Sequence, residues 1–171
     1  HILGYLAENP YHRPCPGSAL EPALARVARW EQRGDGESVS GLTDELQRAM
    51  EKYCGVFRTQ DVLDEGVRRV NAIAARLPDV RLRDHSKVFN TARIEAFELE
   101  NLIAIAQATV VSAAARTESR GAHSRVDFPQ RDDKVWLRHT LYHHDGQRLD
   151  YKPVRMKPLT VESFPPKERV Y

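Results

Sequence analysis

Residues 92–120, ARIEAFELENLIAIAQATVVSAAARTESR, are the longest helix-like stretch of the chain. Asn90 and Thr91 are alternative N-caps for it, and Gly121 suits the position just after a helix where left-handed backbone is needed. Its apolar positions include Ile94, Phe97, Leu102, Ile103, Ala106, Val110 and Ala113. The stretch therefore predicts one long helix. Its Ala-rich second half either admits another helix or domain at close range or reflects helix propensity alone.

Two more amphipathic helices are predicted upstream of this stretch. In residues 40–58 the apolar stripe is Leu42, Leu46, Met50, Tyr53 or Cys54, and Phe57. Thr59 can cap the next helix, which ends before Pro78. The stripe of that helix is Leu63, Val67, Val70, Ile73 or Ala74, and Leu77. Both stripes recur at helical spacing.

A shorter helix is expected to begin at Ser18. Ser18 and Glu21 have the spacing of a capping box, and Pro22 lies in the first turn, where its missing N–H does no harm. Its apolar positions are Leu20, Leu24 and Val27, with Trp30 as a further candidate before Gly34 and Gly36 end the run.

Helices that each bury a single stripe and are joined by short polar turns pack as antiparallel neighbours. We therefore expect a mainly α fold: an antiparallel three-helix bundle, spectrin-repeat-like, with the short helix alongside. The bundle should span residues 18–120, after an upstream segment or linker at 1–17.

Beyond the bundle, residues 121–134 form a charged loop, and the hydrophobic period then changes to that of strands. Residues 135–154 read as a β-hairpin around His144–Gln147, with Asp145-Gly146 as the central pair of a type I′ turn. The Pro-rich remainder of 135–171 reads as an extended strap.

Composition sets further bounds. The 171 residues are 41% hydrophobic and 29% charged, which suits one soluble core. There is no transmembrane run or signal peptide, so we expect a soluble, cytosolic chain without direct membrane insertion. Cys15 and Cys54 form no metal or redox motif and are expected to be free structural thiols. The sequence does not begin with Met, and its first residues form an apolar, helix-like stretch. We therefore expect it to be a piece of a longer protein.

Charge is unevenly distributed. Residues 116–138 carry six Lys/Arg against four Asp/Glu, and residues 147–171 carry six against three, whereas the whole chain has a net charge of +2. This surplus is too diffuse, and too poor in interleaved aromatics, for a nucleic-acid footprint. A basic face that docks on an acidic protein partner fits better.

Catalytic and metal motifs are not evident. His139 and His143 diverge if they lie on a strand, and Glu95, Glu98 and Glu100 lack the histidine partners of a di-iron site. No phosphate-binding Gly-rich loop, nucleophile elbow or Ser/His/Asp pattern appears. We therefore predict no catalytic, cofactor-binding or metal-binding residue in this chain.

The charged end of the long helix has two interpretations. Arg116 and Arg120 could simply complement the dipole of the last helical turn. The density of charge that follows favours a loop that binds another protein surface. The residues predicted to form this domain interface are Arg116, Glu118, Arg120, His123, Arg125 and Asp127.

These same residues carry a resemblance. RTESRGAHSRVDFPQRDD at 116–133, WLRHTLYHHDG at 136–146 and the ending FPPKERVY resemble the C-terminal region of succinate dehydrogenase flavoprotein subunits. CGVFRTQDVLDEGV at 54–67 and FNTARIEAFELENLIAIAQATVVSAAARTESRGAHSR at 89–125 match in the same order. The resemblance covers essentially the whole chain.

The resemblance implies a helical domain that packs on an FAD-binding domain. In this family FAD is usually held by a covalent histidine link, and the dicarboxylate site and proton-transfer arginine lie in the preceding region. The intact subunit would oxidise succinate to fumarate and pass electrons to an iron–sulfur subunit and quinone. It would be peripheral, at the cytoplasmic face of the inner membrane, and contact with a flavin-attachment assembly factor is also implied. The isolated piece would be inactive and would scaffold, with Arg120, His123 and Arg125 bonded to the flavin domain.

Three other assignments remain open. Fumarate reductase flavoproteins share the ESRGAH loop. The HSRVDFP motif and the ending at Tyr171 resemble the succinate enzyme more. L-Aspartate oxidase has a similar loop but usually ends sooner. An independent, non-enzymatic helical interaction module would show the same amphipathic pattern.

Overall fold

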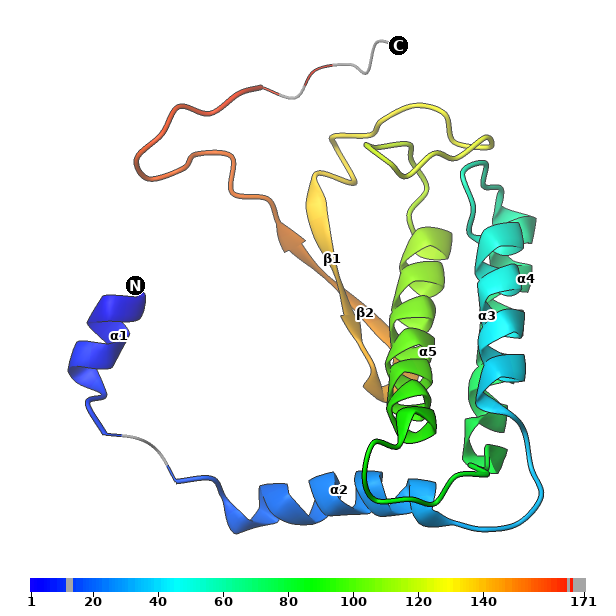
Figure 1. Cartoon of the computed structure of the whole chain (residues 1–171). Helices are drawn as coiled ribbons and strands as arrows, with labels where there is room; N and C mark the ends of the chain where they lie inside the picture. Colours follow the sequence, from blue (N-terminus) through cyan, green and yellow to red (C-terminus); the bar gives the residue numbers. More distant parts are fainter. Residues whose placement is uncertain (12–13, 166, 168–171) are drawn as a thin grey trace.

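The computed structural model describes residues 1–11, 14–165 and 167. Its α-helices are α1 (Ile2–Glu8), α2 (Gly17–Ala28), α3 (Val39–Tyr53), α4 (Gln60–Arg76) and α5 (Thr91–Ala115). Single 3-10 turns occur at Arg29–Glu31, Leu77–Asp79 and Asp145–Gln147, and the strands are β1 (Arg138–His143) and β2 (Arg148–Pro153). The chain is thus mainly α with a small hairpin, as the sequence predicts (Figure 1).

Helices α3, α4 and α5 form the predicted antiparallel bundle, running up, down and up in Figure 1. Their stripes meet in one core that also takes in Trp30, Val80 and Leu82. The fully buried side chains of this core are contributed by all three helices: Leu42, Leu63, Val70, Ile73, Leu99 and Val110. Periodicity alone therefore located most of the core.

Gly66 marks a close approach within the bundle. A Cβ at this position of α4 would lie 2.9 Å from Cβ of Tyr53 and 3.0 Å from Cγ2 of Val110. Both are closer than ordinary carbon contacts of about 3.5–4.0 Å. The absent side chain therefore lets α4 lie against α3 and α5 at once.

Helix starts differ in how they are capped. Ser38 accepts a hydrogen bond from the Gly41 N–H, and Asn90 accepts one from the Arg93 N–H at 2.8 Å, so Asn90 rather than Thr91 caps α5. Thr59 holds the predicted cap position of α4, but its hydroxyl bonds to Asp61 and caps no N–H. The N-terminal cap of α4 is instead Asp127, which accepts from the Gln60 N–H.

The short helix departs from expectation. The helix α2 begins at Gly17 after Pro16, so Ser18 lies inside it and the predicted capping box does not form. In Figure 1, α2 crosses the end of the bundle rather than lying along its side. It is anchored by Trp30, which packs edge-on against Phe97, and by Arg26, which bonds to Glu100 at 3.0 Å. Its apolar stripe is exposed: Leu20, Leu24 and Val27.

Three further predicted core positions are also exposed in this chain. Phe57 lies beyond the end of α3, and Ile94 and Leu102 face outward from α5. The buried residues of α5 instead include Leu99, one turn before Ile103, and Ala96, two turns before it. The helix α1 likewise buries none of its residues.

The hairpin lies beside α5 (Figure 1). Antiparallel pairing of β1 and β2 joins Arg138 with Pro153 and His143 with Arg148, which leaves a four-residue connection. Positive φ occurs at Gly146 (70°) and Gln147 (52°) but not at Asp145, so the predicted type I′ turn is wrong. The side chain of Gln147 donates to Oδ1 of Asn71 on α4 at 2.8 Å. This contact holds the turn against the bundle and favours a four-residue connection over the predicted two-residue turn.

The remaining tail has no regular element over the described residues 154–165 and 167. Part of the predicted strap, residues 166 and 168–171, lies outside the described residues.

A pair of truncations on α5 tests the core. Leu99→Ala should lower the free energy of unfolding by roughly 2–5 kcal/mol, because Leu99 is 0% exposed and its removal leaves a cavity. Ile94→Ala, on the same helix but 57% exposed, should cost less than about 1 kcal/mol. Urea unfolding followed by circular dichroism measures both. Equal losses would contradict this packing.

Candidate functional site

The long helix ends five residues earlier than predicted. Its last residue is Ala115, and Arg116 has extended backbone (φ −88°, ψ 107°). The exposed carbonyls of the last turn are taken by Arg125, whose Nη1 donates to the carbonyls of Ala113 (3.4 Å) and Arg116 (3.2 Å). A buried guanidinium therefore provides the C-terminal cap, and Arg116 and Arg120 do not lie in a last helical turn.

Gly121 has the expected left-handed backbone, with φ of 57°, but in a different place. It lies in a tight turn in which the N–H of Arg120 donates to the His123 carbonyl at 2.8 Å and the N–H of His123 donates back at 3.0 Å. The glycine reverses the loop rather than ending the helix.

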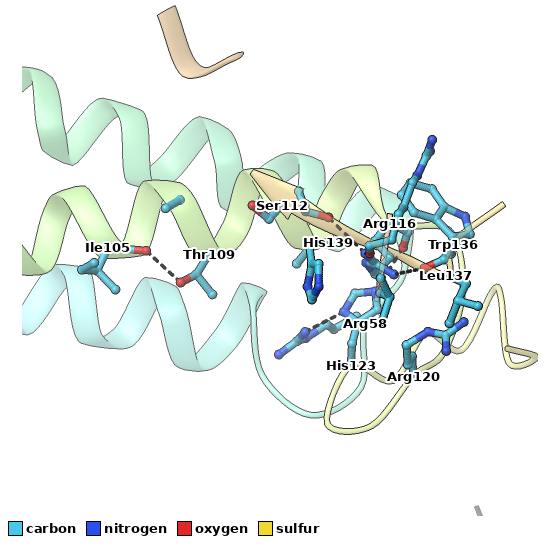
Figure 2. A pocket seen from close by; sticks show the side chains of 15 residues that line it. Arg58, Ile105, Thr109, Ser112, Arg116, Arg120, His123, Trp136, Leu137 and His139 are labelled. Carbon is cyan, nitrogen blue, oxygen red and sulfur yellow. Dashed lines mark hydrogen bonds between the residues drawn. The ribbon is translucent and has the colours of Figure 1, made fainter. Parts of the chain in front are cut away.

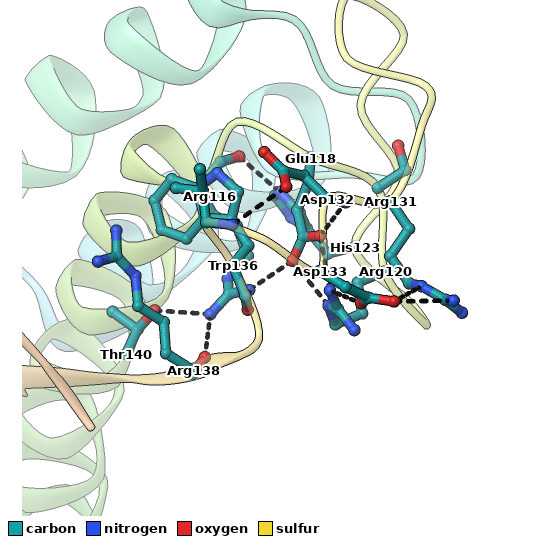
Figure 3. Close-up of polar contacts among 12 residues, drawn as sticks. Arg116, Glu118, Arg120, His123, Arg131, Asp132, Asp133, Trp136, Arg138 and Thr140 are labelled. Atoms are coloured by element: carbon teal, nitrogen blue, oxygen red, sulfur yellow. Dashed lines mark hydrogen bonds and ion pairs between the residues drawn. The ribbon is translucent and has the colours of Figure 1, made fainter. Parts of the chain in front are cut away.

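Because α5 ends at Ala115, the charged loop begins at Arg116 rather than at residue 121, and Glu118, which is 0% exposed, is its centre. Arg120 grips its carboxylate with two bonds, from Nε at 2.7 Å and from Nη2 at 2.9 Å. Arg116 donates from Nη1 at 2.6 Å, and the backbone N–H of Asp132 donates at 2.8 Å (Figure 3). Burial by itself raises the pKa of Glu118, but these bonds outweigh it and hold the pKa below its usual value. Glu118 is thus a buried carboxylate held in its charged form.

Arg116 connects this carboxylate to the hairpin. Its Nη1 also donates to the carbonyl of Trp136 at 3.0 Å, and its Nη2 donates to the carbonyl of Arg138 at 2.7 Å and to the hydroxyl of Thr140 at 3.1 Å. The guanidinium lies over the Trp136 ring, 4.9 Å from its centroid. One side chain therefore positions the first residues of β1 relative to the end of α5.

Arg125 and Asp127 make a second ion pair, in which Arg125 is buried and Asp127 is partly exposed. Arg125 is 1% exposed, and its Nε and Nη2 donate to the two carboxylate oxygens of Asp127, each at 2.7 Å. Asp127 also accepts from the backbone N–H of Gln60 at 2.8 Å, and so supplies the N-terminal cap of α4 that Thr59 does not. The pair joins the end of α5 to the start of α4.

His123 is held in one tautomer. Its Nδ1 lies 2.9 Å from Nη1 of Arg58, and its Nε2 lies 3.0 Å from the Arg116 carbonyl. Because arginine only donates and a carbonyl only accepts, Nδ1 carries the lone pair and Nε2 the proton. Burial, and then the cations Arg58, Arg125 and Arg116, lower the pKa of His123 against the opposing effect of the carbonyl bond. His123 is therefore a neutral bridge.

The structure thus brings all six predicted interface residues together but turns several inward. Glu118 and Arg125 are buried among partners of this chain, whereas Arg120 and His123 remain partly exposed. Three residues that the sequence analysis did not single out complete the site: Arg58, Trp136 and Arg138. Arg58 lies before α4, 65 positions from His123, so no local pattern connects the two.

Next to this network is a groove of about 800 Å³ between the second half of α5 and β1 (Figure 2). Ala108, Thr109 and Ser112 of the Ala-rich stretch line it from α5, facing Arg138 and His139 from β1. Within the described part of the chain, no group of three or more His, Cys, Asp or Glu is placed to hold a metal ion. The arrangement binds and positions by charge, and it shows no nucleophile with an activating base.

Comparison with known proteins gives consistent results. A family model described as "Fumarate reductase flavoprotein C-term" matches residues 43–171. A succinate dehydrogenase flavoprotein subunit of Coxiella burnetii is 46% identical over 99% of this chain and 29% of its own length. A fumarate reductase flavoprotein subunit of Mycobacterium tuberculosis is 37% identical over 80% of this chain and 23% of its own length.

A solved quinol fumarate reductase of E. coli, in an FrdA variant, superimposes with a TM-score of 0.76 at 33% identity, covering 90% of this chain and 27% of the solved one. The chain thus spans less than a third of the relatives that it matches.

Neutralising the carboxylate of Glu118 tests the cluster of donors around it. Glu118→Gln should lower the free energy of unfolding by roughly 3 kcal/mol, because it leaves Arg116 without its anion while Arg120 keeps Asp133. The same change at exposed Glu95 on α5 should cost less than about 0.5 kcal/mol. Urea unfolding at pH 7 makes the comparison, and a loss at Glu118 no larger than at Glu95 would refute the role of the cluster.

The Arg125–Asp127 pair predicts that the free energy of unfolding depends on pH in the acid range. Hydrogen bonds from Arg125 lower the pKa of Asp127 to about 2; burial opposes them, and the Gln60 N–H adds to them. Because the folded pKa lies below the usual value of about 3.9, the stabilisation is complete above that value and is lost as the pH falls towards 2.

We therefore expect Asp127→Asn to cost about 1–2 kcal/mol at pH 7, allowing for partial exposure, and progressively less below about pH 4. Urea midpoints measured from pH 7 to pH 3 test this, with Asp35→Asn, at an exposed carboxylate outside the loop, as the control. A cost that does not change with pH would contradict the assignment.

Proposed function

Because the chain belongs to the family of C-terminal domains of succinate dehydrogenase and fumarate reductase flavoproteins, we propose that it comes from a succinate dehydrogenase. The observation that carries this choice is identity: 46% over 99% of the chain to the Coxiella succinate enzyme, against 37% over 80% to the mycobacterial fumarate reductase. Fumarate reductase is the second candidate, favoured by the description of the family and by the E. coli structure.

The parent protein would oxidise succinate to fumarate. Hydride would pass to FAD, and electrons would then pass singly to an iron–sulfur subunit and on to quinone. The sheet described here has only two antiparallel strands, so the described residues contain no parallel β–α–β unit of the kind whose glycine loop binds the pyrophosphate of FAD. We accordingly assign FAD, and a covalent link to it, to the portion of the parent that precedes this domain.

The domain itself would act as a rigid support for the flavin domain. Two ion pairs, each with one buried member, fix the loop at the end of the bundle, and Arg120 and His123 remain partly exposed beside the groove. Of the residues predicted to contact the flavin domain, Arg125 has its guanidinium occupied within this chain. Its proposed contribution is therefore to hold the loop in shape, while Arg120 and His123 make contact.

The position in the cell follows from the proposed assembly. No helix among the described residues is long and apolar enough to cross a bilayer. We propose attachment through the iron–sulfur subunit at the cytoplasmic face of the inner membrane, and a further, transient contact with a factor that promotes flavin attachment.

The test uses the full-length parent, isolated with its iron–sulfur subunit. The wild-type complex should reduce an artificial quinone with succinate and contain bound flavin. Arg120→Gln should lower flavin content or succinate turnover several-fold, because it removes a partly exposed guanidinium whose Nη1 has no partner among the described residues.

Arg48→Gln, at an exposed position of α3, is the matched control and should behave as wild type. Circular dichroism of both variants separates a lost contact from a lost fold. Wild-type flavin content and turnover in Arg120→Gln would refute the supporting role, and a parent that only reduces fumarate would favour the second candidate.

A further inference from the structure

The groove beside α5 carries charge that the described residues do not neutralise. Its lining includes Arg58, Arg116, Arg120 and Arg138, together with His123 and His139 (Figure 2). Arg116 and Arg120 are paired with Glu118, and Arg120 also with Asp133 at 2.7 Å. Among the described residues, Arg58 and Arg138 form no ion pair with a carboxylate.

Arg58 is fixed in place by neutral acceptors alone. Its guanidinium donates to the carbonyls of Gly55 (2.8 Å) and Cys54 (3.1 Å) and to Nδ1 of His123. These bonds hold its position without cancelling its charge. The result is a cation whose geometry is set before any partner arrives.

Arg138 is fixed by aromatic rings. Its guanidinium carbon lies 3.7 Å from the centroid of Tyr151 and 4.6 Å from that of Trp136. Its Nε is buried and has no hydrogen-bond partner within the described part of the chain. The rings hold the guanidinium in place without supplying an anion, so the charge of Arg138 is left for a partner.

The floor of the groove is apolar on one side. Ile105 of α5, which lines the groove, is 67% exposed, and Ala108 and Leu137 add further apolar lining. A small anion could neutralise the arginines but would leave this apolar surface in water. An occupant that carries both carboxylates and apolar side chains satisfies both parts of the groove.

We propose that this groove receives an acidic segment of the portion of the full-length flavoprotein that precedes this domain, with its carboxylates paired to Arg58 and Arg138. The inference rests on the proposed function. Relatives extend over more than three times the length matched here, so they contain such a portion. A second copy of this chain is a poorer occupant, because apposing two such grooves would bring their unpaired arginines together.

Zero-length cross-linking tests the pairing directly. In the full-length parent, Arg58→Lys or Arg138→Lys keeps the positive charge and adds an amine that a carbodiimide can couple to a touching carboxylate. Mass spectrometry should find an amide link from residue 58 or 138 to an Asp or Glu that precedes His1. Arg48→Lys, on the exposed face of α3, should form no such link. No link, links only within residues 1–171, or links between copies would overturn the proposal.

Thiol labelling provides an independent measurement. Ile105→Cys in the full-length parent should react with a maleimide at least tenfold more slowly than Gln47→Cys, which lies at an exposed position of α3. Adding Arg58→Gln and Arg138→Gln should restore fast labelling at position 105, whereas equal rates in the otherwise unchanged parent would overturn the proposal. Neither readout depends on turnover: a parent that oxidises succinate yet labels quickly at 105 refutes only this inference. A cross-linked parent without succinate activity refutes only the proposed function.

Discussion

The end of this molecule that carries the charged loop is organised by one buried carboxylate, that of Glu118. A carboxylate that is 0% exposed loses its hydration and is tolerated as an anion only if donors surround it. Arg116, Arg120 and the Asp132 N–H supply them, and each comes from a different part of the loop. The requirement to neutralise one charge therefore fixes the relative positions of the helix end, the glycine turn and the approach to the hairpin.

The second pair extends the same constraint to the helices. In an antiparallel bundle the C-terminus of α5 and the N-terminus of α4 lie at the same end, and their dipoles present opposite partial charges there. Arg125 faces the carbonyl end of α5, and Asp127 faces the N–H end of α4, while the two side chains bond to each other. Each residue caps one helix and neutralises the other residue. This explains why the guanidinium of Arg125 is held inward, with Asp127 beside it at the partly exposed edge.

The sequence predicted what local periodicity controls and missed what distant partners control. The stripes of α3 and α4 and the Asn90 cap follow from spacing and side-chain chemistry within a few residues. The end of α5 does not, because the group that terminates it is Arg125, ten positions beyond Ala115. For α2, periodicity shows that Leu20, Leu24 and Val27 share a face, but it cannot say whether this chain contains what covers it. The density of charge at 116–127 drew attention to residues that the fold does bring together, yet it could not show that Glu118 and Arg125 point inward, and their role as a domain interface stays a prediction.

The two ion pairs determine which side chains remain available to contact another domain, because the buried Glu118 and Arg125 already have all their hydrogen-bond partners. Once Glu118 has its donors and Arg125 has its acceptors, neither can bond elsewhere without exposing an unpaired buried charge. The loop is therefore stiff, and any charge pairing with another domain beyond the proposed contacts of Arg120 and His123 falls to groups whose charge is not cancelled. Arg58 and Arg138 meet this condition within the described residues, and both are held rigidly, one by carbonyls and a neutral imidazole, the other between aromatic rings. A partner that docks on them loses little side-chain entropy, because the fold has already ordered the two cations.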